Sequence, residues 1–205
     1  MKAAVTLALG AVLLAGCASH SPGPEAADEL ARQGHKLAEQ GHIQAARKLL
    51  EQALALDPLH AWASFDRGQI LLNEGQLQPA LADLDRAVAR QPNNPRFLGA
   101  RCVARAVATP ATPDLSDCGK ALAQPGKPGN ALVARGQAYL ALQRNQDALA
   151  DFEAALTANS ANMRALYGRG VARQRLGDTR GLGDQQLAVA RLPGAGREFV
   201  VSALH

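Results

Sequence analysis

Aromatic residues are scarce in this sequence of 205 residues, which contains one Trp, two Tyr and four Phe. β-Sheet proteins favour aromatic and β-branched residues, so the shortage argues against a β-sandwich or a β-barrel. Ala and Leu recur throughout instead, and both are good helix formers. With 47% apolar and 20% charged residues, the chain can bury a core and is not a disordered polymer. The composition therefore favours an all-α protein.

A continuous run of basic residues is also missing. The formal net charge is +4, but the Arg and Lys residues are dispersed and no five of them are consecutive. Proteins that bind nucleic acid usually concentrate their cations in a patch or along one stripe. We therefore expect no nucleic-acid partner, and we assign these cations to solvated surfaces.

Motifs that carry catalysis are absent as well. The sequence contains no G-x-S-x-G, no P-loop, no H-E-x-x-H and no dinucleotide-binding glycine fingerprint. His35, Glu39 and His42 would share one face of a continuous helix, as metal ligands can, but Gly41 interrupts that helix. We expect solvent-exposed histidines, no metal, no cofactor and no enzymatic activity. An enzyme or a metal-binding protein built on the same helical scaffold is the alternative.

No apolar run is long enough to span a bilayer, which needs about 20 residues. The longest one extends from Ala3 to Leu14, after Lys2 and before small residues and Cys17, which is the pattern of a secretory signal. Its ending, LAGC, resembles the bacterial lipobox. In lipoproteins the chain is cut before the cysteine, whose thiol carries a lipid. An uncleaved anchor with an incidental cysteine is the alternative.

This resemblance implies that residues 1–16 are a signal peptide and that Cys17 becomes the lipidated anchor of a membrane-attached protein. Ala18 stands where lipoproteins kept in the inner membrane typically carry Asp. For a Gram-negative cell, the expected location is therefore the periplasmic face of the outer membrane. Residues 17–26 include a stretch rich in Ser, Pro and Gly, which predicts a flexible tether.

Small residues recur with a period of 34, which is the mark of a repeat protein. One column contains Gly34, Gly68, Cys102, Gly136 and Gly170, and the next contains Ala46, Ala80, Asp114, Ala148 and Leu182. A third column contains Ala53, Ala87, Ala121, Ala155 and Val189. Between the last two columns stand Leu50, Leu84, Cys118, Phe152 and the outlier Gln186.

Each unit is predicted to contain two helices. In the second unit, Asn73-Glu74-Gly75 supplies the left-handed residue that ends a first helix. A second helix is expected from Leu77 or Gln78 to about Ala89, before Pro92. Gly68 disfavours a helix interior by about 1 kcal/mol relative to Ala. Close approach of the two antiparallel helices at this glycine would offset that penalty.

The pattern resembles the tetratricopeptide repeat (TPR), whose motif has small residues in these three columns, an aromatic or apolar residue in the fourth and a proline near its end. The resemblance covers residues 27–196, as repeats 27–60, 61–94, 95–128, 129–162 and 163–196. It implies an α-solenoid of about five helix-turn-helix repeats. Residues 197–205 are expected to form a short C-terminal capping helix in which Phe199 and Val200 cover the last apolar face.

Two repeats depart from the motif. In the third, Thr112-Pro113-Asp114 indicates a capped helix start, although Cys102 and Asp114 replace small residues. In the fifth, the three glycines of RLGDTRGLGD make the second helix doubtful.

Cys102 and Cys118 are the cysteines that remain once Cys17 is lipidated. An even pair in an exported protein is more often bonded than free, and the resemblance places the two on facing helices of the third repeat. Two buried free thiols are the alternative, because cysteine packs well in cores.

The resemblance also implies that the first helices line a concave groove, which TPR proteins use to bind a protein or peptide. Trp62 and Phe65 are expected to form an apolar anchor there, and Arg164 and Arg175 to bind acidic groups of the ligand. Packing between repeats is the alternative role for the aromatic residues. The predicted partner-binding residues are Trp62, Phe65, Gln69, Asn73, Arg96, Asn130, Gln137, Arg164, Tyr167 and Arg175. The expected function is an envelope scaffold for pilus, secretion or cell-wall assembly.

Overall fold

The computed structural model describes residues 23–126 and 128–199. This part of the chain folds into ten α-helices and one 3-10 helix, without a strand. The helices are α1 (Pro24–Gln40), α2 (Ile43–Leu56), α3 (Ala61–Asn73), α4 (Leu77–Arg90), α5 (Pro95–Ala108), α6 (Ser116–Leu122), α7 (Gly129–Ala141), α8 (Asn145–Ala158), α9 (Met163–Arg175), α10 (Gly181–Arg191) and η1 (Arg197–Phe199). The all-α prediction is confirmed.

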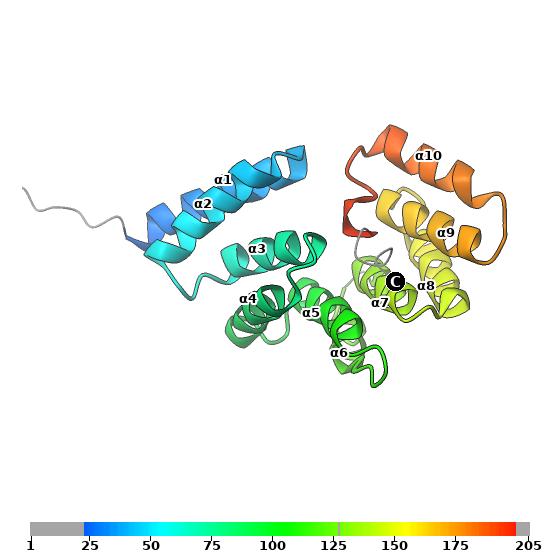
Figure 1. The fold of residues 1–205 in the computed structure, drawn as a ribbon, viewed down its shortest axis with the longest axis horizontal. Coiled ribbons are helices and arrows are strands. Elements are labelled where there is room, and N and C mark those ends of the chain that lie inside the picture. The colour runs from blue at the N-terminus through cyan, green and yellow to red at the C-terminus, as the bar shows by residue number, and fades with distance from the viewer. Residues whose placement is uncertain (1–22, 127, 200–205) are drawn as a thin grey trace, which may run out of the picture.

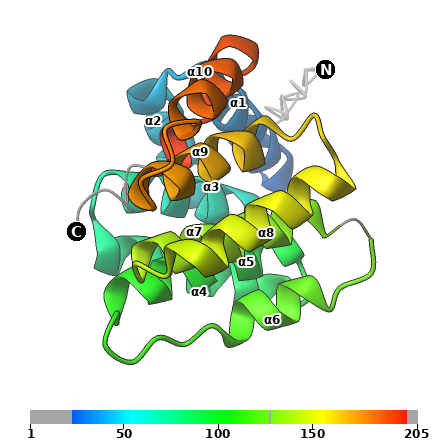
Figure 2. The ribbon, with the colours of Figure 1, turned by 90° about the vertical axis from the view of Figure 1, so that its right-hand side faces the viewer.

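The ten α-helices form five consecutive pairs, each joined by a short connection. In Figure 1 the pairs follow an arc, with α1 and α2 at one end and α9 and α10 at the other. Figure 2 shows the pair α9 and α10 stacked above the pair α7 and α8. The first helices α1, α3, α5, α7 and α9 contact one another in sequence, so one helix of every repeat faces the inside of the arc. This is the expected α-solenoid.

The columns of small residues lie where the two helices of a pair meet. A Cβ atom on Gly68 would lie 3.0 Å from Cγ of Leu84, and Ala80 and Ala87 are completely buried. The predicted reason for a glycine in mid-helix is therefore confirmed. Helix α4 also has the predicted extent.

The turns within four of the five pairs use left-handed backbone. Gly41, Gly75 and Gly177 have φ angles of 88°, 74° and 82°, which glycine adopts without a steric penalty. The prediction for Gly75 is confirmed. The fourth repeat places Gln143 in the same column with φ 58°, an uncommon conformation for a residue with a side chain.

The two ends of the chain fall partly outside the described residues. Helix α1 begins at Pro24, with Gly23 in extended conformation at the N-cap. Proline is favoured in the first helical turn because an N–H group at this position would have no acceptor within the helix, so its absence costs nothing. Residues 24–26, assigned to the tether, are therefore helical, whereas the signal peptide, Cys17 and Val200 lie outside the described residues. Of the expected C-terminal cap, the described part is η1.

The second helix of the third repeat starts later than predicted. Helix α6 has only seven residues and begins at Ser116, so the predicted start at residues 112–114 is wrong by two residues or more. Asp114 still stabilises the helix end, because its carboxylate accepts a hydrogen bond of 3.0 Å from the backbone N–H of Ser116.

The second helix of the fifth repeat is present, although its glycines made it doubtful. A Cβ atom on Gly181 would collide with the backbone oxygen of Gly170, so glycine is required at this crossing. Helix α10 lies one residue early in the period, since Ala188 is completely buried where the period placed Val189, which is exposed. The assignment of Leu182, Val189 and Gln186 to the columns is therefore wrong by one residue.

Candidate functional site

A cavity of about 370 Å³ opens on the inside of the arc. Its walls come from α1, α3, α5, α7 and α9, from Ile43 at the start of α2, and from the segment after α10. Seven of the ten residues predicted for the groove line this cavity: Phe65, Gln69, Asn73, Arg96, Asn130, Gln137 and Arg164. The lining has both charge signs, because Glu39 and Asp66 stand among the arginines. Trp62, Tyr167 and Arg175 lie outside it.

The aromatic residues of the second repeat pack against the third. Phe65 is only 2% exposed, and its ring centroid lies 5.0 Å from that of Phe97 and 5.8 Å from that of Trp62. The guanidinium carbon of Arg96 lies 5.2 Å from the Trp62 ring centroid, within the range of a cation–π contact. Trp62 and Phe65 are therefore part of the interface between repeats, and they position the cation of Arg96 at the groove.

His35 is held by the next repeat. Its Nδ1 lies 3.1 Å from both carboxylate oxygens of Asp66, and its Nε2 lies 3.5 Å from Glu39. The hydrogen bond with Asp66 raises the pKa of His35 above 6.5; burial opposes this, the charges of Asp66 and Glu39 add to it, and Arg96 opposes it. His42 is exposed, so the two histidines do not converge. No group of three or more His, Cys, Asp or Glu side chains in the described residues could hold a metal ion.

Arg175 supports the scaffold rather than the cavity. Its guanidinium donates a 2.7 Å hydrogen bond to the backbone oxygen of Leu140, near the end of α7. Burial lowers the pKa of Arg175. The arginine therefore joins the fourth and fifth repeats.

A ladder of arginine–aspartate pairs runs through the second to fifth repeats. In each pair, two guanidinium nitrogens donate to the two oxygens of one carboxylate, at distances from 2.6 to 3.0 Å. This two-point geometry is the strongest form of such a contact. The pairs are Arg67 with Asp83, Arg101 with Asp117, Arg135 with Asp151, and Arg169 with Asp184.

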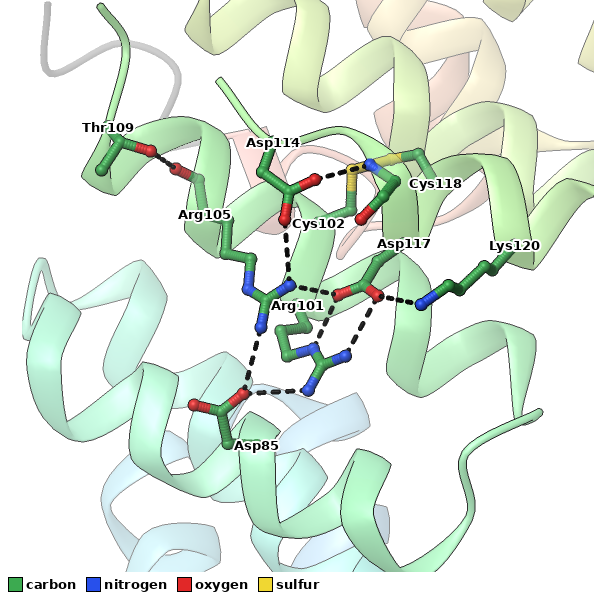
Figure 3. Close-up of polar contacts among 10 residues, drawn as sticks. Asp85, Arg101, Cys102, Arg105, Thr109, Asp114, Asp117, Cys118 and Lys120 are labelled. Carbon is green, nitrogen blue, oxygen red and sulfur yellow. Dashed lines mark hydrogen bonds and ion pairs between the residues drawn. A yellow bond between two sulfur atoms is a disulfide. The ribbon is translucent and has the colours of Figure 1, made fainter. Parts of the chain in front are cut away.

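Sequence reasoning missed this ladder, although its signal was present. Four arginines stand 34 residues apart, and three of the four aspartates do so too. The first repeat has Gln33 and Leu49 in these columns and has no such pair. In the third repeat the pair joins a larger network, because Arg101 also donates to Asp85 and Arg105 donates to Asp117 (Figure 3).

The two cysteines of the third repeat are bonded in the structure. Their sulfur atoms are 2.07 Å apart and their Cα atoms 5.5 Å apart, which joins α5 to α6 (Figure 3). Both residues are completely buried. Cys102 takes the place of the glycine and Cys118 the place of the large apolar residue that meet in the first, second and fourth repeats.

These features decide the family. A family model for the tetratricopeptide repeat matches residues 31–95 and 133–179. The chain belongs to the tetratricopeptide repeat family. A solved TPR protein of Thermus thermophilus, TTC0263, has the same fold, with a TM-score of 0.68 at 20% identity over 88% of this chain and 100% of that one. The MamA protein is similar with a TM-score of 0.50 at 17% identity, over 85% of this chain and 92% of that one.

One curated relative matches a smaller region. The cellulose synthase operon protein C of Pseudomonas fluorescens (strain SBW25) is 41% identical over 69 residues, which are 33% of this chain and 5% of that protein. The TPR fold is a protein–protein interaction scaffold, and TPR proteins bind peptides or proteins in a groove. Among the described residues, no helix is both long and apolar enough to cross a bilayer.

Proposed function

We propose that this TPR protein is a lipid-anchored scaffold of the cell envelope, which binds a peptide segment of a partner protein in its concave groove. The observation that carries the proposal is the cavity of about 370 Å³ lined by the first helix of all five repeats. A ligand there would contact every repeat at once. TPR scaffolds are generally non-enzymatic, and binding is the activity that we assign.

The lining favours a peptide over a nucleic acid. Amide side chains of Gln69, Asn73 and Asn130 can pair with peptide N–H and C=O groups, since each amide both donates and accepts. Arg96 and Arg164 offer charge-assisted hydrogen bonds to acidic groups, while Glu39 and Asp66 would repel a phosphate backbone.

The location rests on the sequence. The LAGC motif and the short apolar run before it support lipidation of Cys17, and Ala18 supports the periplasmic face of an outer membrane. The relative named for a cellulose synthase operon is consistent with a role beside an envelope assembly. Radiolabelled palmitate should enter the wild type and not Cys17→Ser, and equal labelling of the two would contradict the anchor.

The groove is tested by exchanging exposed residues on its wall. Arg96 and Asn130 line the cavity and are exposed, so Arg96→Ala with Asn130→Ala removes ligand contacts without opening the core. Arg90→Ala with Asn93→Ala removes the same two residue types from exposed positions outside the lining.

Both variants are used as bait on detergent-solubilised envelopes, and captured proteins are quantified by mass spectrometry. The groove variant should lose the partners that the wild type and the control variant share. Equal capture by both variants would place the binding surface elsewhere.

A further inference from the structure

The segment after α10 turns back into the groove. Residues 192–199, here called the C-terminal arm, follow the end of α10 at Arg191. Three arm residues, Leu192, Gly194 and Arg197, line the cavity together with the first helices. In Figure 1 the arm lies on the side of α9 that faces α1 and α3. It leaves the outer face of α10 uncovered, where Leu182 and Leu187 stay exposed.

One side chain of the arm reaches the opposite end of the arc. Nη1 of Arg197 donates hydrogen bonds of 3.1 Å to the backbone oxygens of Ala38 and Glu39, in the last turn of α1. Carbonyl groups at a helix C-terminus have no partner within the helix, and cations are favoured there. Gly41 leaves the space that the guanidinium fills, since a Cβ atom at that position would collide with it.

A second side chain of the arm enters an aromatic site. Phe199 is 5% exposed, and its ring centroid lies 5.2 Å from that of Tyr167 and 5.9 Å from that of Phe152. Gly196 lies against the same tyrosine, because a Cβ atom there would be 2.5 Å from Cζ of Tyr167. The arm therefore places a guanidinium in the groove, while the ring of Phe199 packs outside the cavity lining and anchors the arm there.

We infer that the C-terminal arm is an internal ligand of the groove, and that the partner is a peptide whose cationic side chain replaces that of Arg197. This inference rests on the proposed function of the groove and adds the chemistry of the ligand and a competitor for it. The regular structure of the arm is one 3-10 helix of three residues, and side chains hold it in place: Arg197 on α1, and the buried Ala195 and Phe199. Its tether gives it an effective concentration in the millimolar range, which a partner must overcome.

The competition can be measured with the arm itself as the probe. A fluorescein-labelled, amidated peptide LPGAGREF, which is residues 192–199, is titrated with the purified full-length chain, and fluorescence anisotropy is recorded. Gly196→Ala loosens the arm by adding a methyl group against Tyr167, without changing the groove. Gly183→Ala is its matched control, because a Cβ atom at this glycine of α10, outside the cavity lining, meets no atom within 4 Å.

We expect the wild type and Gly183→Ala to bind the peptide equally weakly and Gly196→Ala to bind it about tenfold more tightly. The bound arm leaves only a fraction of the molecules open, and the apparent dissociation constant is the intrinsic one divided by that fraction. Peptides with alanine in place of the arginine or of the phenylalanine should lose most of this binding. Arg197→Ala should act like Gly196→Ala, with Arg191→Ala as the control for an exposed arginine.

Equal peptide affinity in the wild type and in both arm variants would overturn the inference. So would unfolding of both variants by circular dichroism, since the arm would then be a structural wall and not a ligand. A failure of this inference can be told apart from a failure of the proposed function. If Arg96→Ala with Asn130→Ala abolishes partner capture while the arm variants leave peptide affinity unchanged, the groove binds a partner but the arm does not compete for it.

Discussion

The third and fourth repeats differ in the residues that pack where their two helices cross. Where the two helices of the fourth repeat cross, Gly136 leaves room for the ring of Phe152, and a Cβ atom on the glycine would lie 2.7 Å from it. In the third repeat the same two columns contain Cys102 and Cys118, joined by a bond. The first position needs a small residue only while the second is large.

The difference follows from how much surface each second helix can bury. Helix α8 has 14 residues and buries Ala148, Phe152 and Ala155 along one face. Helix α6 has seven residues, because its connection contains Pro110 and Pro113, so it has half the length over which to pack. Because α6 has less apolar surface to bury, apolar contact alone stabilises its packing less. The disulfide therefore holds α6 against α5.

The largest expected effect comes from removing the buried ring of Phe152 in the fourth repeat. Phe152→Ala should lower the free energy of unfolding by about 3 to 5 kcal/mol, because the ring is completely buried and its loss leaves a cavity. Urea denaturation followed by circular dichroism measures this. Leu187→Ala is the control, since this leucine is 47% exposed. A loss below about 1 kcal/mol would show that neighbouring residues refill the cavity.

The disulfide should contribute slightly less. The double change Cys102→Ala with Cys118→Ala should lower the free energy of unfolding by about 3 kcal/mol under oxidising conditions, as expected for a bond with a sequence separation of 16. With reductant present, wild type and variant should approach each other. Intact mass after alkylation without reductant is the direct check, and two freely alkylated thiols in protein purified under oxidising conditions would refute the bond.

A smaller effect distinguishes the glycines of the two repeats. Gly136→Ala should destabilise the protein by about 1 to 3 kcal/mol, because the added methyl group meets the Phe152 ring. Gly119→Ala, in the short helix α6, meets no atom within 4 Å and should stabilise by about 0.5 to 1 kcal/mol through helix propensity. Thermal unfolding should therefore shift in opposite directions, and shifts of the same sign would contradict the comparison.

The smallest effect is a dependence of stability on pH. Neither the Gly136–Phe152 contact nor the disulfide can produce it, since neither contains a titrating group. The pKa of His35 is raised in the folded protein, so the protonated form is the stabilised one. Its contribution is fully present below pH 6.5 and is lost as the pH rises through the folded-state pKa. His35→Gln should remove this slope from a series of urea curves, whereas His42→Gln, at an exposed position, and Phe152→Ala should keep it. A slope unchanged in His35→Gln would assign it to another group.

Much of the fold was predictable because the repeat is a local signal. Gly75 ends a helix through its own left-handed backbone conformation, and the small residues indicate where two neighbouring helices cross. The shift in the fifth repeat was not predictable from the period. Helix α10 lies one residue early, which moves every later position, and the burial of Ala188 and the contact between Gly170 and Gly181 show which register the helix takes.

The groove was predictable in part. Polar lining residues such as Gln69 and Asn130 follow from their place in the repeat, whereas the burial of Phe65 depends on Phe97 in the next repeat. Arg67 and Asp83 each belong to a column that recurs every 34 residues. Predicting their ion pair would also have required the assumption that these two polar columns face each other.

By itself, the sequence determined the repeat period, the helical class, the left-handed turn at Gly75 and the pairing of two helices within each repeat, because these depend on residues close together along the chain. Tertiary structure alone decided where the C-terminal arm lies. Arg197 and Ala38 are 159 residues apart, and no local pattern relates them. They meet because the small rotations between stacked repeats add up to an arc, and that sum brings the arm back to the first helix.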